Sequence, residues 1–216
     1  MAYCVYQDIN LMTNIVVADI ANADITSLIA EAVKQVNDAL NILVVREPID
    51  FIDNTRSNDI DGTNKTFYVK NWYGKFLADM NNDGEITKDD VIVYQVASDG
   101  TETTPTITSV DDDACSVTLE TAPTANNNYY ITYSYSPVRQ ITSYVDPRLK
   151  LATVFLTAAF CYAKLNIGCS PSVTFGSTRI TKDMDSFSHY YQRYLDIIAQ
   201  INSVEEIHSK VSEDTF

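Results

Sequence analysis

The sequence predicts an α+β fold, a helical bundle of about three long helices with an inserted antiparallel β-sandwich or barrel domain. Two patterns carry this prediction. Apolar residues recur at helical spacing towards both ends of the 216-residue chain, whereas the middle shows the two-residue alternation that is typical of strands. We therefore assign residues 1–52 and 137–216 to a helical core and residues 53–136 to an inserted β domain.

The first long helix is predicted between Asp24 and Leu43. Residues 1–22, which precede it, show no clean periodicity, and we expect them to form an extended arm. Within the helix, one side is apolar and the opposite side is polar, so that the apolar side needs a partner to cover it. The apolar side consists of Ile25, Leu28, Ile29, Ala32, Val33, Val36 and Leu40.

The β domain follows residues 46–62, which are rich in turn-forming residues and mark a boundary. Five segments then alternate in polarity and are rich in Val, Ile, Thr and Tyr, which is typical of strands separated by turns. We expect them to form a small antiparallel sandwich or barrel. The five segments are Lys65–Tyr73, Asp90–Ala97, Pro105–Val110, Cys115–Thr121 and Tyr129–Tyr135.

The central helix is predicted from Asp146 to Gly168. Asp146 suits the N-cap, Pro147 suits the first helical position, and Gly168 can adopt the left-handed turn that ends a helix. The 13 residues between Leu151 and Ala163 carry no charge, and apolar residues occur on every side of the helix, so we expect protein to surround it. This uncharged run is shorter than the roughly 20 residues that cross a bilayer, which argues against a membrane span.

A third long helix is predicted after the segment from Ser170 to Asp183, which alternates in polarity and could form a short hairpin or an ordered loop. From Asp183 the helical spacing returns, and Asp183 or Asp185 lies near the positive end of the helix. Residues 203–216 read as a polar C-terminal tail that becomes ordered when a partner binds. The apolar stripe of this helix consists of Phe187, Tyr191, Tyr194, Leu195, Ile198 and Ile201.

Acidic residues outnumber basic ones by 29 to 15, giving a net charge of −14. Residues 53–136 alone carry −9, whereas residues 137–216 are neutral. This balance disfavours tight binding to nucleic acid, which depends on basic side chains that displace counterions from phosphates.

The four cysteines, Cys4, Cys115, Cys161 and Cys169, include no Cys-x-x-Cys pair, and we expect reduced thiols. No secretory signal is visible at the start, so the product is expected to stay in the cell that makes it.

The segment from Asp79 to Asp90 follows the pattern of a calcium loop. Oxygen-bearing side chains stand at positions 1, 3, 5, 9 and 12, a glycine at position 6 allows the sharp turn, position 7 offers a carbonyl, and position 8 is apolar. This pattern predicts a possible Ca²⁺ site, although the residues after Asp90 resemble a strand, and a solvated turn between strands would explain the same residues. The candidate metal residues are Asp79, Asn81, Asp83, Glu85, Thr87 and Asp90.

No catalytic apparatus is visible in the sequence. His189 and His208 are the only histidines, and neither belongs to a known metal or nucleophile motif. The six glycines are scattered singly, so no phosphate-binding loop is present, and the acidic run at residues 111–113 is more simply a turn. We therefore expect a protein that is not an enzyme, without catalytic or cofactor-binding residues.

The order of the predicted parts resembles the head-to-tail connector, or adaptor, proteins of tailed viruses. Three helical sequences carry the resemblance: Asp-Ile-Thr-Ser-Leu-Ile-Ala-Glu-Ala-Val from residue 24, Asp-Pro-Arg-Leu-Lys-Leu-Ala-Thr from residue 146, and Tyr-Tyr-Gln-Arg-Tyr-Leu from residue 190. The sequences at residues 117–123 and 130–137 are similar to the decorating β domain that some of these proteins carry. The resemblance spans nearly the whole chain as a pattern, without a diagnostic motif.

The resemblance implies a structural neck protein of the virion, assembled in the host cytoplasm. It would form a ring with copies of itself, usually twelve-fold, between the portal protein and a downstream neck or tail-completion protein. DNA would pass through the ring only as cargo, and no membrane is involved. The alternative is a calcium-dependent, dockerin-like protein-binding module, which would need a second calcium loop; the sequence shows one.

Overall fold

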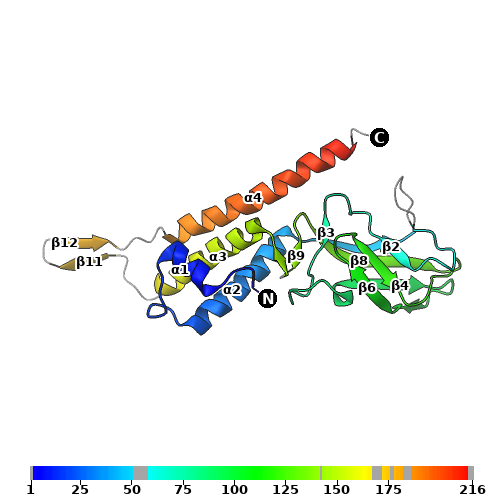
Figure 1. The fold of residues 1–216 in the computed structure, drawn as a ribbon, viewed down its shortest axis with the longest axis horizontal. Helices are drawn as coiled ribbons and strands as arrows, with labels where there is room; N and C mark the ends of the chain where they lie inside the picture. The colour runs from blue at the N-terminus through cyan, green and yellow to red at the C-terminus, as the bar shows by residue number, and fades with distance from the viewer. Residues whose placement is uncertain are drawn as a thin grey trace. The chain divides into compact units, whose positions relative to one another are not determined.

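Figure 1 shows the computed structural model of the chain, which describes residues 2–50, 58–141, 143–166, 172–175, 178–181 and 186–213. The chain divides into two compact units. The first, here called the helical unit, combines residues 1–39 with residues 147–204. The second, here called the β unit, combines residues 40–146 with residues 205–216.

The predicted fold class, a bundle of about three long helices with an inserted sandwich or barrel, was wrong. The described residues form four α-helices, and their strands are divided among four antiparallel sheets. The additional helix is α1, which has eight residues from Tyr6 to Thr13, where an extended arm was expected. Such a short helix makes about two turns, too few for a clear periodicity. Its first turn is held by Asp8, which accepts a hydrogen bond from the backbone N–H of Val5 at 2.9 Å.

The helical unit is organised around α3, Pro147–Asn166, which confirms the predicted central helix up to its last described residues. Buried residues lie around most of α3, as expected for a helix without a polar side. They are Leu149, Ala152, Thr153, Val154, Leu156, Thr157, Ala158, Ala159 and Cys161. The predicted helix end at Gly168 and the thiol of Cys169 lie outside the described residues.

The other helices contact α3 through polar and aromatic side chains. Lys150 and Lys164 on α3 form ion pairs with Asp8 on α1 and Asp24 on α2, Asn22–Leu40, at 2.8 and 2.6 Å. On α4, Ser186–Glu213, the ring of Tyr190 stacks on Tyr162 of α3, with the ring centroids 5.5 Å apart. These contacts tie three helices to one central element.

The last helix begins at Ser186, so Asp183 and Asp185, the predicted N-terminal acids, lie outside the described residues. The helix continues to Glu213, through much of the stretch that was expected to form a polar tail from residue 203.

Between α3 and α4 lies an antiparallel hairpin of β11, Ser172–Phe175, and β12, Thr178–Thr181. No described helix is long and apolar enough to cross a membrane.

The β unit contains a five-stranded sheet in the order β1-β8-β4-β5, in which β3 also pairs with β8, and a three-stranded sheet in the order β2-β7-β6. A separate two-stranded sheet joins β9 and β10. Every pair is antiparallel. The strands are β1 Ile42–Pro48, β2 Thr66–Tyr68, β3 Phe76–Leu77, β4 Val91–Val96, β5 Glu102–Thr103, β6 Ile107–Asp111, β7 Ser116–Leu119, β8 Asn128–Ser136, β9 Gln140–Ile141 and β10 Tyr144–Val145.

The five predicted strand segments each overlap a strand of the structure, namely β2, β4, β6, β7 and β8. The sequence did not predict β1, which follows α2 directly and forms one end of the larger sheet beside β8. One hydrophobic core joins residues of both larger sheets, including Phe67 on β2, Val93 on β4 and Ile131 on β8. Within it, the hydroxyl of Tyr133 donates a hydrogen bond to the buried carboxyl group of Glu47 at 2.5 Å, so this polar pair is satisfied.

Candidate functional site

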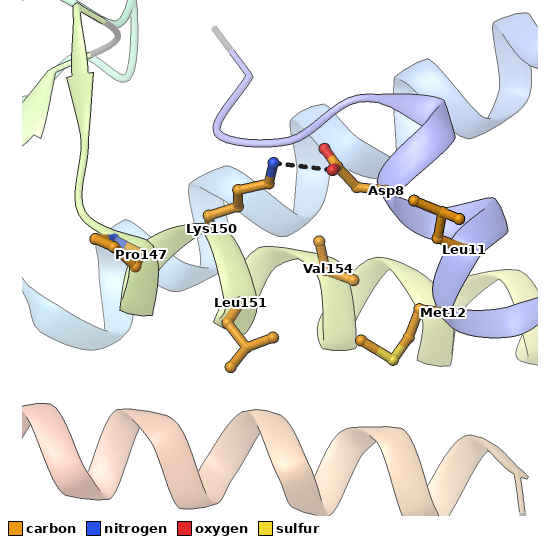
Figure 2. A pocket seen from close by; sticks show the side chains of 7 residues that line it. All are labelled: Asp8, Leu11, Met12, Pro147, Lys150, Leu151 and Val154. Atoms are coloured by element: carbon orange, nitrogen blue, oxygen red, sulfur yellow. Dashed lines mark ion pairs between the residues drawn. The ribbon is translucent and has the colours of Figure 1, made fainter.

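The helical unit contains an open groove between α1 and the start of α3, with a volume of about 350 Å³ (Figure 2). Asp8, Leu11 and Met12 line it from α1. Pro147, Lys150, Leu151 and Val154 line it from α3. We call these seven residues the α1–α3 groove.

The spacing of these residues explains why they meet. Positions 8, 11 and 12 lie on one side of α1, and positions 147, 150, 151 and 154 lie on one side of α3, because residues three or four apart are neighbours on a helix surface. The two helices pack together, so the two sides form the opposite walls of one groove. The apolar part of the groove therefore follows directly from where α1 lies on α3.

The charged residues of the groove neutralise each other. The ammonium group of Lys150 lies 2.8 Å from the carboxylate of Asp8, and Figure 2 shows the two side chains pointing towards one another. Burial alone would raise the pKa of Asp8, but the hydrogen bond from Lys150, the N–H of Val5 and the charge of Lys150 outweigh it and lower that pKa. Asp8 therefore stays ionised at neutral pH, and the rest of the groove is apolar.

Large apolar side chains of the groove face water. Leu11 is 84% exposed, Leu151 is 41% exposed and Met12 is 37% exposed. A single exposed leucine needs no explanation, but apolar residues that gather around a hollow are typical of a surface that binds another protein. We therefore take the α1–α3 groove as the candidate functional site.

Sequence reasoning missed this groove because it placed residues 1–22 in an extended arm. Once α1 is a helix, Leu11 and Met12 come beside the α3 residues. The signal that could have revealed α1 is local: Asp8 stands three residues after Val5, in the position from which a carboxylate caps a helix start.

The predicted calcium loop forms a compact turn held by its own side chains. Asp79 is fully buried and accepts hydrogen bonds from the backbone N–H groups of Asp83 and Gly84, at 3.1 and 2.9 Å. Asp90, also buried, accepts from the N–H groups of Met80, Asn81 and Thr87, at 2.8, 3.1 and 2.8 Å. The backbone of Gly84 has φ +100°, which fits the sharp turn expected there.

Three of the remaining candidate metal residues also accept hydrogen bonds from backbone groups of the loop. Asn81 accepts a hydrogen bond from the N–H of Asp83, Asp83 accepts from the N–H of Glu85, and Thr87 accepts from the N–H of Asp89. Burial and the nearby charge of Asp90 raise the pKa of Asp79, although the N–H groups of Gly84 and Asp83 oppose this. A cation beside Asp79 would favour its ionised form.

Within the residues that the structure describes, no three Asp, Glu, His or Cys side chains gather in an arrangement that could hold a metal ion. The chain leaves the loop through a short 3₁₀ turn, Lys88–Asp90, and continues directly as β4, so the flank is a strand, as the sequence indicated. Calcium binding at Asp79, Asn81, Asp83, Glu85, Thr87 and Asp90 stays a prediction.

The other sequence candidates have structural roles. The run at residues 111–113 forms the predicted turn, since Asp111 accepts hydrogen bonds from the N–H groups of Asp113 and Ala114. Cys4, Cys115 and Cys161 are buried thiols that form no disulfide bond with one another. Burial raises the pKa of Cys4 to about 12 and that of Cys161 to about 11, so neither is a reactive thiolate at neutral pH.

No protein-family model matches the chain, and no curated protein matches it.

The Asp8–Lys150 pair should contribute stability that depends on pH. Folding lowers the pKa of Asp8, so the ionised carboxylate stabilises the folded protein at pH values above its ordinary pKa of 3.8. This stabilisation is lost as the pH falls through the lower pKa of the folded state. We expect Asp8→Asn to lower the melting temperature at pH 7, and the difference from wild type to narrow below about pH 4. Thermal denaturation of wild type, Asp8→Asn, Lys150→Met and the double variant measures this. Effects that simply add would contradict a direct interaction.

The loop carboxylates should stabilise the β unit without any metal. Asp90→Asn replaces one accepting oxygen by a donor amide and leaves at least one of three backbone N–H groups without its partner. We expect the variant to lose about 1–3 kcal/mol of unfolding free energy in the presence of EDTA. Urea denaturation measures this, with Asp89→Asn at the neighbouring exposed position as the control. If Asp90→Asn and Asp89→Asn were equally stable, this prediction would be contradicted.

The metal prediction has its own measurement. A rise in the melting temperature of the wild-type protein on addition of calcium would support it.

Proposed function

We propose that this protein is a structural neck protein of a tailed virus. It forms an oligomeric ring, with twelve copies as the expected number, between the portal protein and a downstream neck or tail-completion protein. DNA passes through the ring as cargo. The observation that carries the proposal is the exposed apolar groove on the helical unit, which gives a self-assembling protein a surface to bury.

The distribution of charge supports a ring built through the helical units. Residues 1–39 and 147–204 contain seven basic and eight acidic residues, a net charge of −1. Residues 40–146 and 205–216, the β unit, contain eight basic and 21 acidic residues, a net charge of −13. Copies can therefore approach through their helical units without net repulsion, whereas their β units repel one another.

The acidic balance also suits a channel that DNA traverses. A protein holds DNA tightly when its basic side chains neutralise phosphates and release counterions. Here the basic residues are few, and several of the described ones are paired with carboxylates, as Lys150, Lys164 and Arg139 are. Such a surface offers DNA little to adhere to.

The ring is tested with the full-length protein, alone and mixed with the portal protein encoded in the same genome. We expect electron microscopy to show closed rings with a central channel, and mass photometry to give one dominant multiple of the 24.2 kDa chain. The apolar groove gives the reason, since water-exposed leucine and methionine side chains become buried on assembly. If the protein stays monomeric at micromolar concentrations, both alone and with the portal protein, the proposal is contradicted.

A further inference from the structure

The β unit contains a hollow of about 330 Å³ with a mostly polar lining. Gln95 on β4 and Tyr129 on β8 line it from the larger sheet, and the other residues lie just before β6 or shortly after β7 of the smaller sheet. The N–H of Glu120 donates a hydrogen bond to the carbonyl of Thr106 at 2.9 Å, which holds these two segments together. We call the hollow the polar pocket, and its lining residues are Gln95, Pro105, Thr106, Glu120, Thr121, Ala122, Thr124 and Tyr129.

Gln95 occupies a position where the strand pattern predicts an apolar residue. Val91 and Val93 on the same strand are 4% and 0% exposed, and residues two apart share one face of a sheet. Gln95 therefore continues the row of side chains that faces the core. Tyr129, its direct partner on β8, is 5% exposed and lies on the same face. A polar residue that replaces an apolar one at an inward position is typical of a functional site.

Polar groups of the pocket retain unused hydrogen-bonding capacity. The hydroxyl of Tyr129 accepts a hydrogen bond from the N–H of Thr124 at 3.3 Å, but its own proton has no acceptor among the residues that the structure describes. Within the same part of the chain, the side-chain amide of Gln95 and the carboxylate of Glu120 form no hydrogen bond or ion pair. Since buried polar groups are normally paired, the Tyr129 hydroxyl is a donor that a ligand can satisfy.

The unused groups select the chemical class of the ligand. Tyr129 and Gln95 have hydrogens to donate, whereas Gln95 and Glu120 have oxygens that accept. A hydroxyl group can pair with both kinds of group, but an ammonium group can only donate. The described residues that line the pocket include no lysine or arginine, and the β unit carries a net charge of −13, which disfavours an anion. A neutral ligand with several hydroxyl groups satisfies the pocket best.

We propose that the polar pocket binds a neutral carbohydrate. Gln95 and Glu120 hold hydroxyl groups of one sugar ring, and Tyr129 donates to an oxygen of the same ring. The apolar carbons of Pro105 and Ala122 suit the C–H groups of the sugar. The volume of about 330 Å³ lies at the lower end of the roughly 300–1,000 Å³ that is typical of small-molecule sites, which limits the pocket to a short saccharide. This inference concerns the β unit and does not rest on the proposed ring.

Ligand-detected NMR with the full-length protein tests the proposal, because saturation transfer works for a monomer and for a large ring alike. The probes are the methyl glycosides of glucose, galactose and mannose, together with N-acetylglucosamine, maltose and lactose. Putrescine and inorganic phosphate serve as the cationic and anionic comparisons. We expect at least one saccharide to give a saturable signal, whereas putrescine and phosphate give none.

Three substitutions locate the binding. Gln95→Leu, Glu120→Ala and Tyr129→Phe each remove a polar group from the pocket, and we expect each to raise the dissociation constant of the bound saccharide at least tenfold. Leucine at position 95 continues the apolar row of β4, so Gln95→Leu should melt no lower than wild type, which separates lost binding from lost folding. The matched control is Glu85→Ala, at an exposed position outside the pocket, and it should bind like wild type.

Binding that is lost in the three pocket variants and kept in the control supports the proposal. If no saccharide binds to wild type, the proposal is wrong. If putrescine or phosphate binds and the pocket variants abolish that binding, the pocket takes a charged ligand and the proposal is likewise wrong. A saccharide that binds equally well to wild type and Gln95→Leu occupies another site, which also overturns it. None of these outcomes bears on the ring function, which the assembly measurements test.

Discussion

The absence of a polar side on α3 is the constraint on which the helical unit depends. A helix that is apolar all round must be covered from every direction. Ion pairs from Lys150 and Lys164 align α1 and α2 beside it, and the stack of Tyr162 on Tyr190 holds α4. Because α1 has only eight residues, it covers α3 incompletely and leaves an apolar hollow at the helix start. The groove is therefore a consequence of a long apolar helix with a short partner.

Net charge is distributed unevenly between the two units. The helical unit combines a nearly neutral composition with exposed apolar side chains, which favours contact with copies of itself. The β unit carries most of the acidic residues and holds its two buried loop carboxylates, Asp79 and Asp90, on backbone N–H groups. Each β unit carries a net charge of −13, so a contact between two β units would bring like charges together, whereas a contact between helical units would not.

The sequence predicted those elements whose signals are long or chemically explicit. Pro147 marked the start of α3, and the alternation of residues 129–135 indicated β8. The sequence did not predict α1, because this helix is too short for a periodic pattern. It did not predict β1 either, because the exposed apolar residues of this strand follow a helix without an intervening turn signal. The groove could not be predicted either, because its lining combines residues such as Leu11 and Leu151 that are 140 positions apart in the sequence. The loop pattern at residues 79–90 was visible, but the hydrogen bonds that its carboxylates make to the backbone were not.

Hydrogen exchange measured over a range of protein concentrations tests the central claim most directly, which is that the hollow left beside α3 is covered by another copy. We predict that backbone amides of α1 become more protected as the concentration rises, while amides of the β unit do not change. Protection of the α1 amides that is independent of concentration, or protection that increases in the β unit instead, would contradict this prediction.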